Sequence, residues 1–61
     1  MIHEPAKITE HVILLKRNGS VIERYIGDEV PNRSRALELI AMLRSARPEE
    51  TIELITTEVF Q

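Results

Sequence analysis

The two histidines are the residues best suited to acid–base or metal chemistry, and each has a carboxylate beside it: His3–Glu4 and Glu10–His11. Imidazole nitrogen and carboxylate oxygen are common ligands of zinc and other transition metals. Consecutive residues of a strand point to opposite faces, however, so Glu10 and His11 should not converge on one ion. His3 lies in a segment with little pattern. We therefore expect no metal site.

Nucleophilic catalysis would need a hydroxyl beside a histidine and a carboxylate. Each serine has a local explanation instead: Ser20 belongs to a turn, Ser34 lies near a helix start, and Ser45 lies on the polar side of that helix. The chain has no cysteine, which excludes disulfides and thiol chemistry, and only two glycines, too few for a phosphate-cradling loop. We expect no enzymatic activity, no catalytic residue and no cofactor.

The basic residues form the other group with chemical potential. Lys16 and Arg17 fall at an expected hairpin tip, and Arg33 and Arg35 open the expected helix. Doubled in a dimer, these positions would suit contacts to a nucleic-acid backbone. Against this, the net charge is -2 and the chain has only one Tyr and one Phe for base stacking. A small nucleic-acid-binding regulator that uses these four residues is our alternative function.

Length and composition limit the kind of fold that can position these residues. Sixty-one residues make one small domain, 1–61, in which we expect residues 1–6 to be a flexible lead-in. A chain this short buries only about 60% of the surface that its unfolded form exposes, so its stability as a monomer is marginal. Without cysteines it cannot gain stability from disulfides, which leaves oligomerisation as the means of stabilisation. No apolar run approaches the roughly 18 residues of a membrane span, and no signal-like segment is visible. We expect a cytoplasmic protein without membrane contact.

The run of residues 11–16 organises the sheet. Its four consecutive aliphatic residues are apolar on both faces of a strand, the pattern of a central strand over about residues 7–16. Asn18-Gly19 then predicts a type I′ hairpin turn into a second strand over residues 20–27. The two-residue turn, which we prefer, predicts the pairs Leu15–Ile22, Leu14–Glu23, Ile13–Arg24, Val12–Tyr25 and His11–Ile26. A bulged turn would shift this pairing by one residue.

An amphipathic helix follows the hairpin. Asn32 is the expected N-cap, with Ser34 as the competing cap, and Pro48 stops the helix after Ala46 or Arg47. A third strand occupies residues 51–60. The apolar residues of the helix recur at helical spacing and predict its buried face: Ala36, Leu39, Ile40, Leu43 and Ala46. We expect Leu39, Ile40 and Leu43 to be the helix residues buried in the core.

The predicted fold is α+β: ββαβ, with a three-stranded antiparallel sheet of order 2-1-3 and one helix packed on one face. Because a single helix covers a single face, the other face of the sheet is left bare, and such a face usually marks an interface. The expected dimer interface comprises Val12, Leu14, Tyr25, Leu54, Ile55 and Val59. The dimer forms either through this face or through edge pairing of the third strand, which contains no Pro and no Lys.

These expectations combine into one function. We expect a non-enzymatic, homodimeric protein-interaction module, of the kind of a small bacterial or phage accessory or inhibitory protein. Its protein partner cannot be read from the residues.

Overall fold

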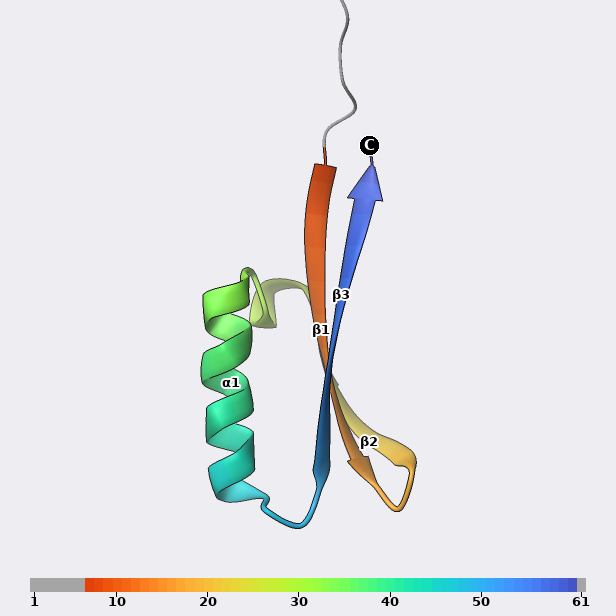
Figure 1. Ribbon diagram of the computed structural model, residues 1–61, viewed down its shortest axis with the longest axis vertical. Coiled ribbons are helices and arrows are strands. Elements are labelled where there is room, and N and C mark those ends of the chain that lie inside the picture. The colour runs from red at the N-terminus through yellow and green to blue at the C-terminus, as the bar shows by residue number, and fades with distance from the viewer. Residues whose placement is uncertain (1–6, 61) are drawn as a thin grey trace, which may run out of the picture.

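A computed structural model describes residues 7–60, so the expected lead-in and His3 lie outside the described residues. The elements follow the predicted ββαβ order, with a single turn of 3-10 helix, η1, before the α-helix (Figure 1). The chain runs through β1 (Lys7–Arg17), β2 (Ser20–Tyr25), η1 (Gly27–Glu29), α1 (Arg33–Ala46) and β3 (Thr51–Phe60).

The strands form one antiparallel sheet of order β2-β1-β3, and α1 lies on one face of it, so the predicted fold class is confirmed. β1 is central, as its two-sided apolar pattern predicts. It pairs with β3 over almost its whole length, from Lys7–Phe60 to Lys16–Thr51. No helix within residues 7–60 is long and apolar enough to cross a membrane.

The hairpin turn is the predicted two-residue turn. Asn18 and Gly19 both have positive φ, 51° and 81°, as a type I′ turn requires, and Arg17 pairs with Ser20. Beyond the turn, however, a β-bulge shifts the register between Leu15 and Lys16. The five predicted pairs between residues 11–15 and residues 22–26 are therefore wrong, and the observed pairs are Leu15–Glu23, Leu14–Arg24 and Ile13–Tyr25.

The bulge changes the twist of the hairpin and the side of the sheet to which the side chains of β2 point. One extra residue in β2 increases the local twist of the hairpin, and bulges of this kind need no special residue type. Because a shift of one residue moves every side chain to the opposite face, Tyr25 and Glu23 come to the same side of the sheet as Ile13 and Leu15. That side is the one covered by α1.

The helix begins and ends at the predicted residues. The Asn32 side-chain oxygen Oδ1 accepts a hydrogen bond from the Arg35 backbone N–H at 2.9 Å, so Asn32 is the N-cap rather than Ser34. At the other end the Arg47 N–H donates to the Leu43 carbonyl at 2.7 Å. Pro48 has no N–H to continue the helix.

The core lies between α1 and the sheet. Ile13 and Leu15 of β1 are fully buried, and the helix contributes Ala36, Ile40 and Leu43. Ile40 and Leu43 are thus buried as predicted, whereas Leu39 is only half-buried against the core. Ala46 is exposed, because the chain turns away from the helix towards β3 at this point. The partly buried side chains around the core are Tyr25, Leu39, Ile52 and Leu54.

Candidate functional site

The face of the sheet opposite α1 carries a row of aliphatic side chains that no element within residues 7–60 covers. Along β1 and β3 these side chains alternate with those of the helix-covered face, since successive side chains of a strand point to opposite sides. Ile8 pairs with Val59, and Val12 pairs with Ile55. The exposed fractions are 40% for Ile8, 38% for Ile55 and 36% for Val59. We call this surface the uncovered face and define it by Ile8, Val12, Leu14, Ile55 and Val59.

Four of the six predicted interface residues lie on this face: Val12, Leu14, Ile55 and Val59. The other two, Tyr25 and Leu54, lie on the opposite side and pack against the core. Tyr25 is there because of the bulge, and Leu54 because it pairs with the buried Ile13.

Ile8 belongs to the uncovered face but is absent from the predicted set. Strand alternation could have identified it. Ile8 is an even number of residues from Val12 in the same strand, so both side chains share a face. Its partner Val59 was in the predicted set, and the two form one cross-strand pair.

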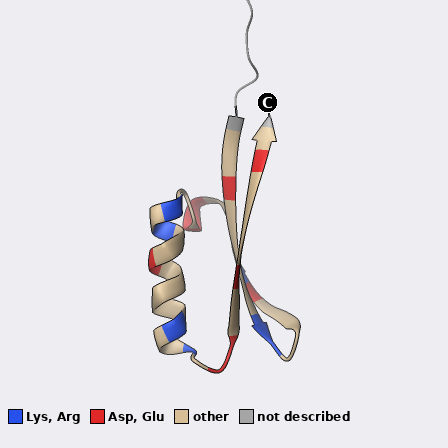
Figure 2. Ribbon diagram, viewed as in Figure 1, with Lys and Arg blue, Asp and Glu red and all other residues tan. Residues whose placement is uncertain are grey.

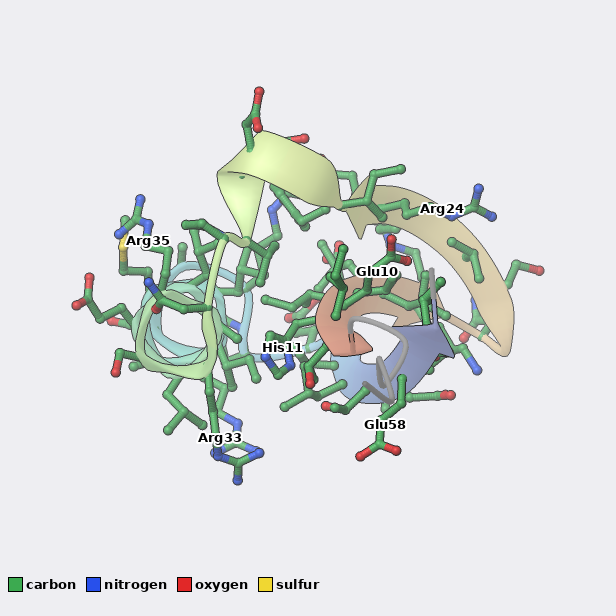
Figure 3. All side chains as sticks on the ribbon, turned by 90° about the horizontal axis from the view of Figure 1, so that it is seen from above. Glu10, His11, Arg24, Arg33, Arg35 and Glu58 are labelled. Atoms are coloured by element: carbon green, nitrogen blue, oxygen red, sulfur yellow. The ribbon has the colours of Figure 1, made fainter. Side chains whose placement is uncertain are left out.

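Charged residues lie within and beside the uncovered face. Glu10 lies between the two apolar pairs and opposite Thr57, and Arg24 lies opposite Leu14. Figure 3 shows Glu10 pointing away from the helix, towards the side on which Arg24 lies. Glu53 is neutralised by Lys16, whose Nζ is 2.6 Å from the Glu53 Oε2. Within residues 7–60, Arg24 makes no ion pair.

The helix and β2 cover only part of the two long strands. Fourteen residues of α-helix span about 21 Å, whereas the eleven residues of β1 span about 37 Å. In Figure 1, β1 and β3 continue past the first turn of α1 as a two-stranded ribbon. β2 pairs only with residues 13–17 of β1, so among the described strands nothing pairs with either edge of this ribbon.

The basic residues of the nucleic-acid hypothesis do not gather into one patch. Lys16 and Arg17 lie at the hairpin end, and Arg33 and Arg35 lie at the opposite end of the helix (Figure 2). Three of the four are paired with carboxylates: Lys16 with Glu53, Arg17 with Glu50, and Arg35 with Glu38 at 3.0 Å. A phosphate would have to displace these partners. The hypothesis stays a prediction.

His11 is a buried side chain of the helix-covered face. It is 8% exposed, its Nδ1 lies 3.1 Å from the Thr56 Oγ1, and Figure 3 shows it pointing towards α1. Glu10 points elsewhere, as strand alternation predicts. In the part of the chain that the structure describes, no group of three potential metal ligands comes together.

A network of charged residues at the hairpin end was not predicted from the sequence. Arg47, just after α1, contacts Glu23 of β2 at 3.0 Å and Glu50 before β3 at 3.5 Å. Glu50 also pairs with Arg17, and its side chain is only 6% exposed. Arg47 and Glu50 are only three residues apart, but the contacts Arg47–Glu23 and Arg17–Glu50 join segments far apart in the sequence, and no local spacing could reveal them.

Tyr25 extends this network. Its hydroxyl donates a hydrogen bond to the Glu23 carboxylate, and this bond raises the pKa of Tyr25 above its usual value of 10.0. Partial burial and the negative charge of Glu23 raise the pKa further, while Arg47 opposes the effect. The arrangement holds β2 to the helix end and offers no nucleophile or ligand set, so we assign it a structural role.

Comparison with known proteins adds no relative to these observations. No protein-family model matches the chain, and no curated protein or solved structure matches it. The surfaces described above are therefore the basis for a functional proposal.

Proposed function

We propose that this protein is a cytoplasmic, non-enzymatic binding module that acts as a homodimer, with the uncovered face as the contact between the two subunits. The observation that carries the proposal is the pair of apolar cross-strand contacts, Ile8–Val59 and Val12–Ile55, on a face that α1 does not cover. Apolar side chains gathered on one exposed surface typically mark a contact with another molecule.

The charges around the face favour a second copy as the occupant. Glu10 and Arg24 both project on the side away from the helix, and Arg24 lacks a carboxylate partner within residues 7–60. In a two-fold dimer whose axis lies near Val12 and perpendicular to the strands, positions at equal distances on either side of Val12 meet across the contact. Glu10 and Leu14, which lies opposite Arg24, are two residues to either side of Val12. Arg24 of each subunit would then neutralise Glu10 of its partner, which supports self-association over contact with an unrelated surface.

Size gives a second reason. A domain of about 60 residues is marginally stable alone, and burying apolar surface contributes about 25 cal/mol per Å². A stable dimer should bury about 1,000 Å² or more in total. Because folding and association would then be coupled, the melting temperature should rise with protein concentration.

The test is sedimentation equilibrium of the full chain at micromolar concentration, together with melting curves over a hundredfold concentration range. We expect a dimer of the 7.0 kDa chain, and we expect Ile55→Asp to weaken the dimer by about tenfold or more. Ile55 is partly exposed, so this change need not disturb the core.

Met42→Asp is the matched control, because Met42 is 58% exposed on the helix, away from the proposed contact. It should leave the dimer intact. A wild-type species at the monomer mass, with a melt independent of concentration, would contradict the proposal.

A further inference from the structure

The half of β1 that precedes Ile13 has an unpaired edge. β1 spans Lys7–Arg17, but β2 pairs only with residues 13–17. The backbone N–H and C=O groups of successive residues point to opposite edges of a strand. Arg17 pairs with Ser20 across the two-residue turn, so the backbone groups of Arg17 point towards β2. By this alternation the N–H and C=O groups of Thr9 and His11 point to the open edge. No backbone hydrogen bond from residues 26–31 reaches them.

A groove runs beside this open edge. It encloses a cavity of about 380 Å³, within the usual range for ligand sites. Residues 8–12 of β1 form one wall, and Ile26, Gly27, Val30 and Pro31 form the other. Gly27, the first residue of η1, has a φ of 64°, a backbone conformation that glycine adopts readily.

We propose that this groove binds an extended peptide segment of a partner protein, which adds to the open edge of β1 as a further strand in line with β2. Backbone groups in the edge would supply the main-chain hydrogen bonds, and the aliphatic side chains of the groove would receive alternate side chains of the peptide. This site lies along the open edge of β1 and shares Ile8 and Val12 with the uncovered face, but its main-chain hydrogen bonds would not require dimerisation.

The surroundings of the groove favour a lone peptide over a second copy of this chain. Every described strand of a second copy carries a neighbouring strand about 4.8 Å away. Residues 26–31 stand on the side where that neighbour would lie. A single extended segment has no such neighbour, so it can enter between the two walls.

The charged residues around the groove indicate which peptide sequence would fit it best. Glu10 lines the groove, and Asp28 and Glu29 lie exposed in η1, the turn between Gly27 and Val30 of the second wall. The described residues that line the groove include no Lys and no Arg. The segment that fits best therefore alternates aliphatic residues with Lys or Arg.

The binding test uses isotope-labelled full-length protein and a blocked peptide of alternating Val and Lys, about six residues long, added up to millimolar concentration. We expect saturable changes in the amide NMR signals of residues 8–12 and 26–31. Two N-methylated peptides then serve as a matched pair. Methylating the alternate amides that face β1 should weaken binding at least tenfold, and methylating the other set should change it less than twofold.

Variants of the protein provide the reciprocal test. Thr9→Pro removes one N–H from the open edge and leaves the groups that pair with β3, so it should weaken binding at least fivefold. Thr9→Ala keeps the N–H and should bind as wild type. Glu10→Gln should weaken binding severalfold at low salt, whereas Glu49→Gln, at the other end of the molecule, should not.

Unchanged β3 amide signals in each variant show that the sheet is intact. The proposal is overturned if no groove signal shifts at millimolar peptide, or if both N-methylated peptides bind equally. It is overturned equally if Thr9→Pro binds as wild type. Changes in the signals of residues 26–31 on raising the concentration of the Ile55→Asp protein alone would assign the groove to a second copy instead. Because Ile55→Asp does not touch the groove, failure here and failure of the dimer are distinguishable.

Discussion

Tyr25 reports on the charged network at the hairpin end. It is the only Tyr in a chain without Trp, so the ultraviolet absorbance of tyrosinate follows this one group. Its hydrogen bond to Glu23 stabilises the neutral hydroxyl and raises its pKa. We expect the absorbance midpoint of the folded protein to lie above 10.0, and Glu23→Gln to lower it. A wild-type midpoint at or below 10.0 would contradict this contact.

The same shift sets the sign of a pH effect on stability. A raised pKa in the folded state means that the contribution of Tyr25 is fully present below the unfolded pKa of about 10. It is lost as the pH rises through the higher folded value. Tyr25→Phe should remove this step from the dependence of unfolding free energy on pH.

Glu50 is the buried anion of the network. Its side chain is 6% exposed between Arg17 and Arg47, whose side chains are 61% and 39% exposed. Both arginines can therefore turn to water when the carboxylate is removed, which limits the penalty of leaving them unpaired. We expect Glu50→Ala to cost about 1–3 kcal/mol in urea denaturation. Glu49→Ala, at the exposed neighbour, should cost less than about 0.5 kcal/mol.

At the scale of the elements, the contact between α1 and the sheet carries the hydrophobic stability. Leu43 is buried in this contact, and its truncation leaves a cavity beside the strands. Leu43→Ala should cost about 2–5 kcal/mol, which approaches the total stability of so small a domain. The adjacent Met42→Ala, at an exposed position, should cost less than about 0.5 kcal/mol in the same denaturation experiment. Equal losses would mean that another helix face packs on the sheet.

For the whole molecule, hydrogen exchange distinguishes the two arrangements that the proposed dimer could take. The residues of β3 that pair with even-numbered residues of β1 point their backbone N–H and C=O groups towards β1. Leu54 and Thr56 pair with odd-numbered residues of β1, so their backbone groups point to the outer edge of β3. A dimer through the uncovered face leaves these two amides exchanging as fast as in the Ile55→Asp variant. Pairing of β3 edges would protect them in the wild type alone.

Local patterns in the sequence were sufficient for the elements and their order. Asn18-Gly19 demands positive φ at two consecutive residues, which only a few turns provide. Asn32 and Pro48 bound the helix through a side-chain cap and a missing N–H, both of which act within one turn. The run of residues 12–15 is apolar on both faces of its strand, the pattern of a central strand, and β1 is central. Each of these signals depends on neighbours in the chain.

Tertiary structure alone decided which side chains meet. The bulge between Leu15 and Lys16 shifted the pairing of β2 by one residue and so moved Tyr25 from the expected interface to the core side. The contacts of Arg47 with Glu23 and of Arg17 with Glu50 join segments that are far apart in the sequence. The open edge beside Thr9 exists because β2 ends early while β1 continues along β3. Such features follow from packing across the chain, which spacing along the sequence does not encode.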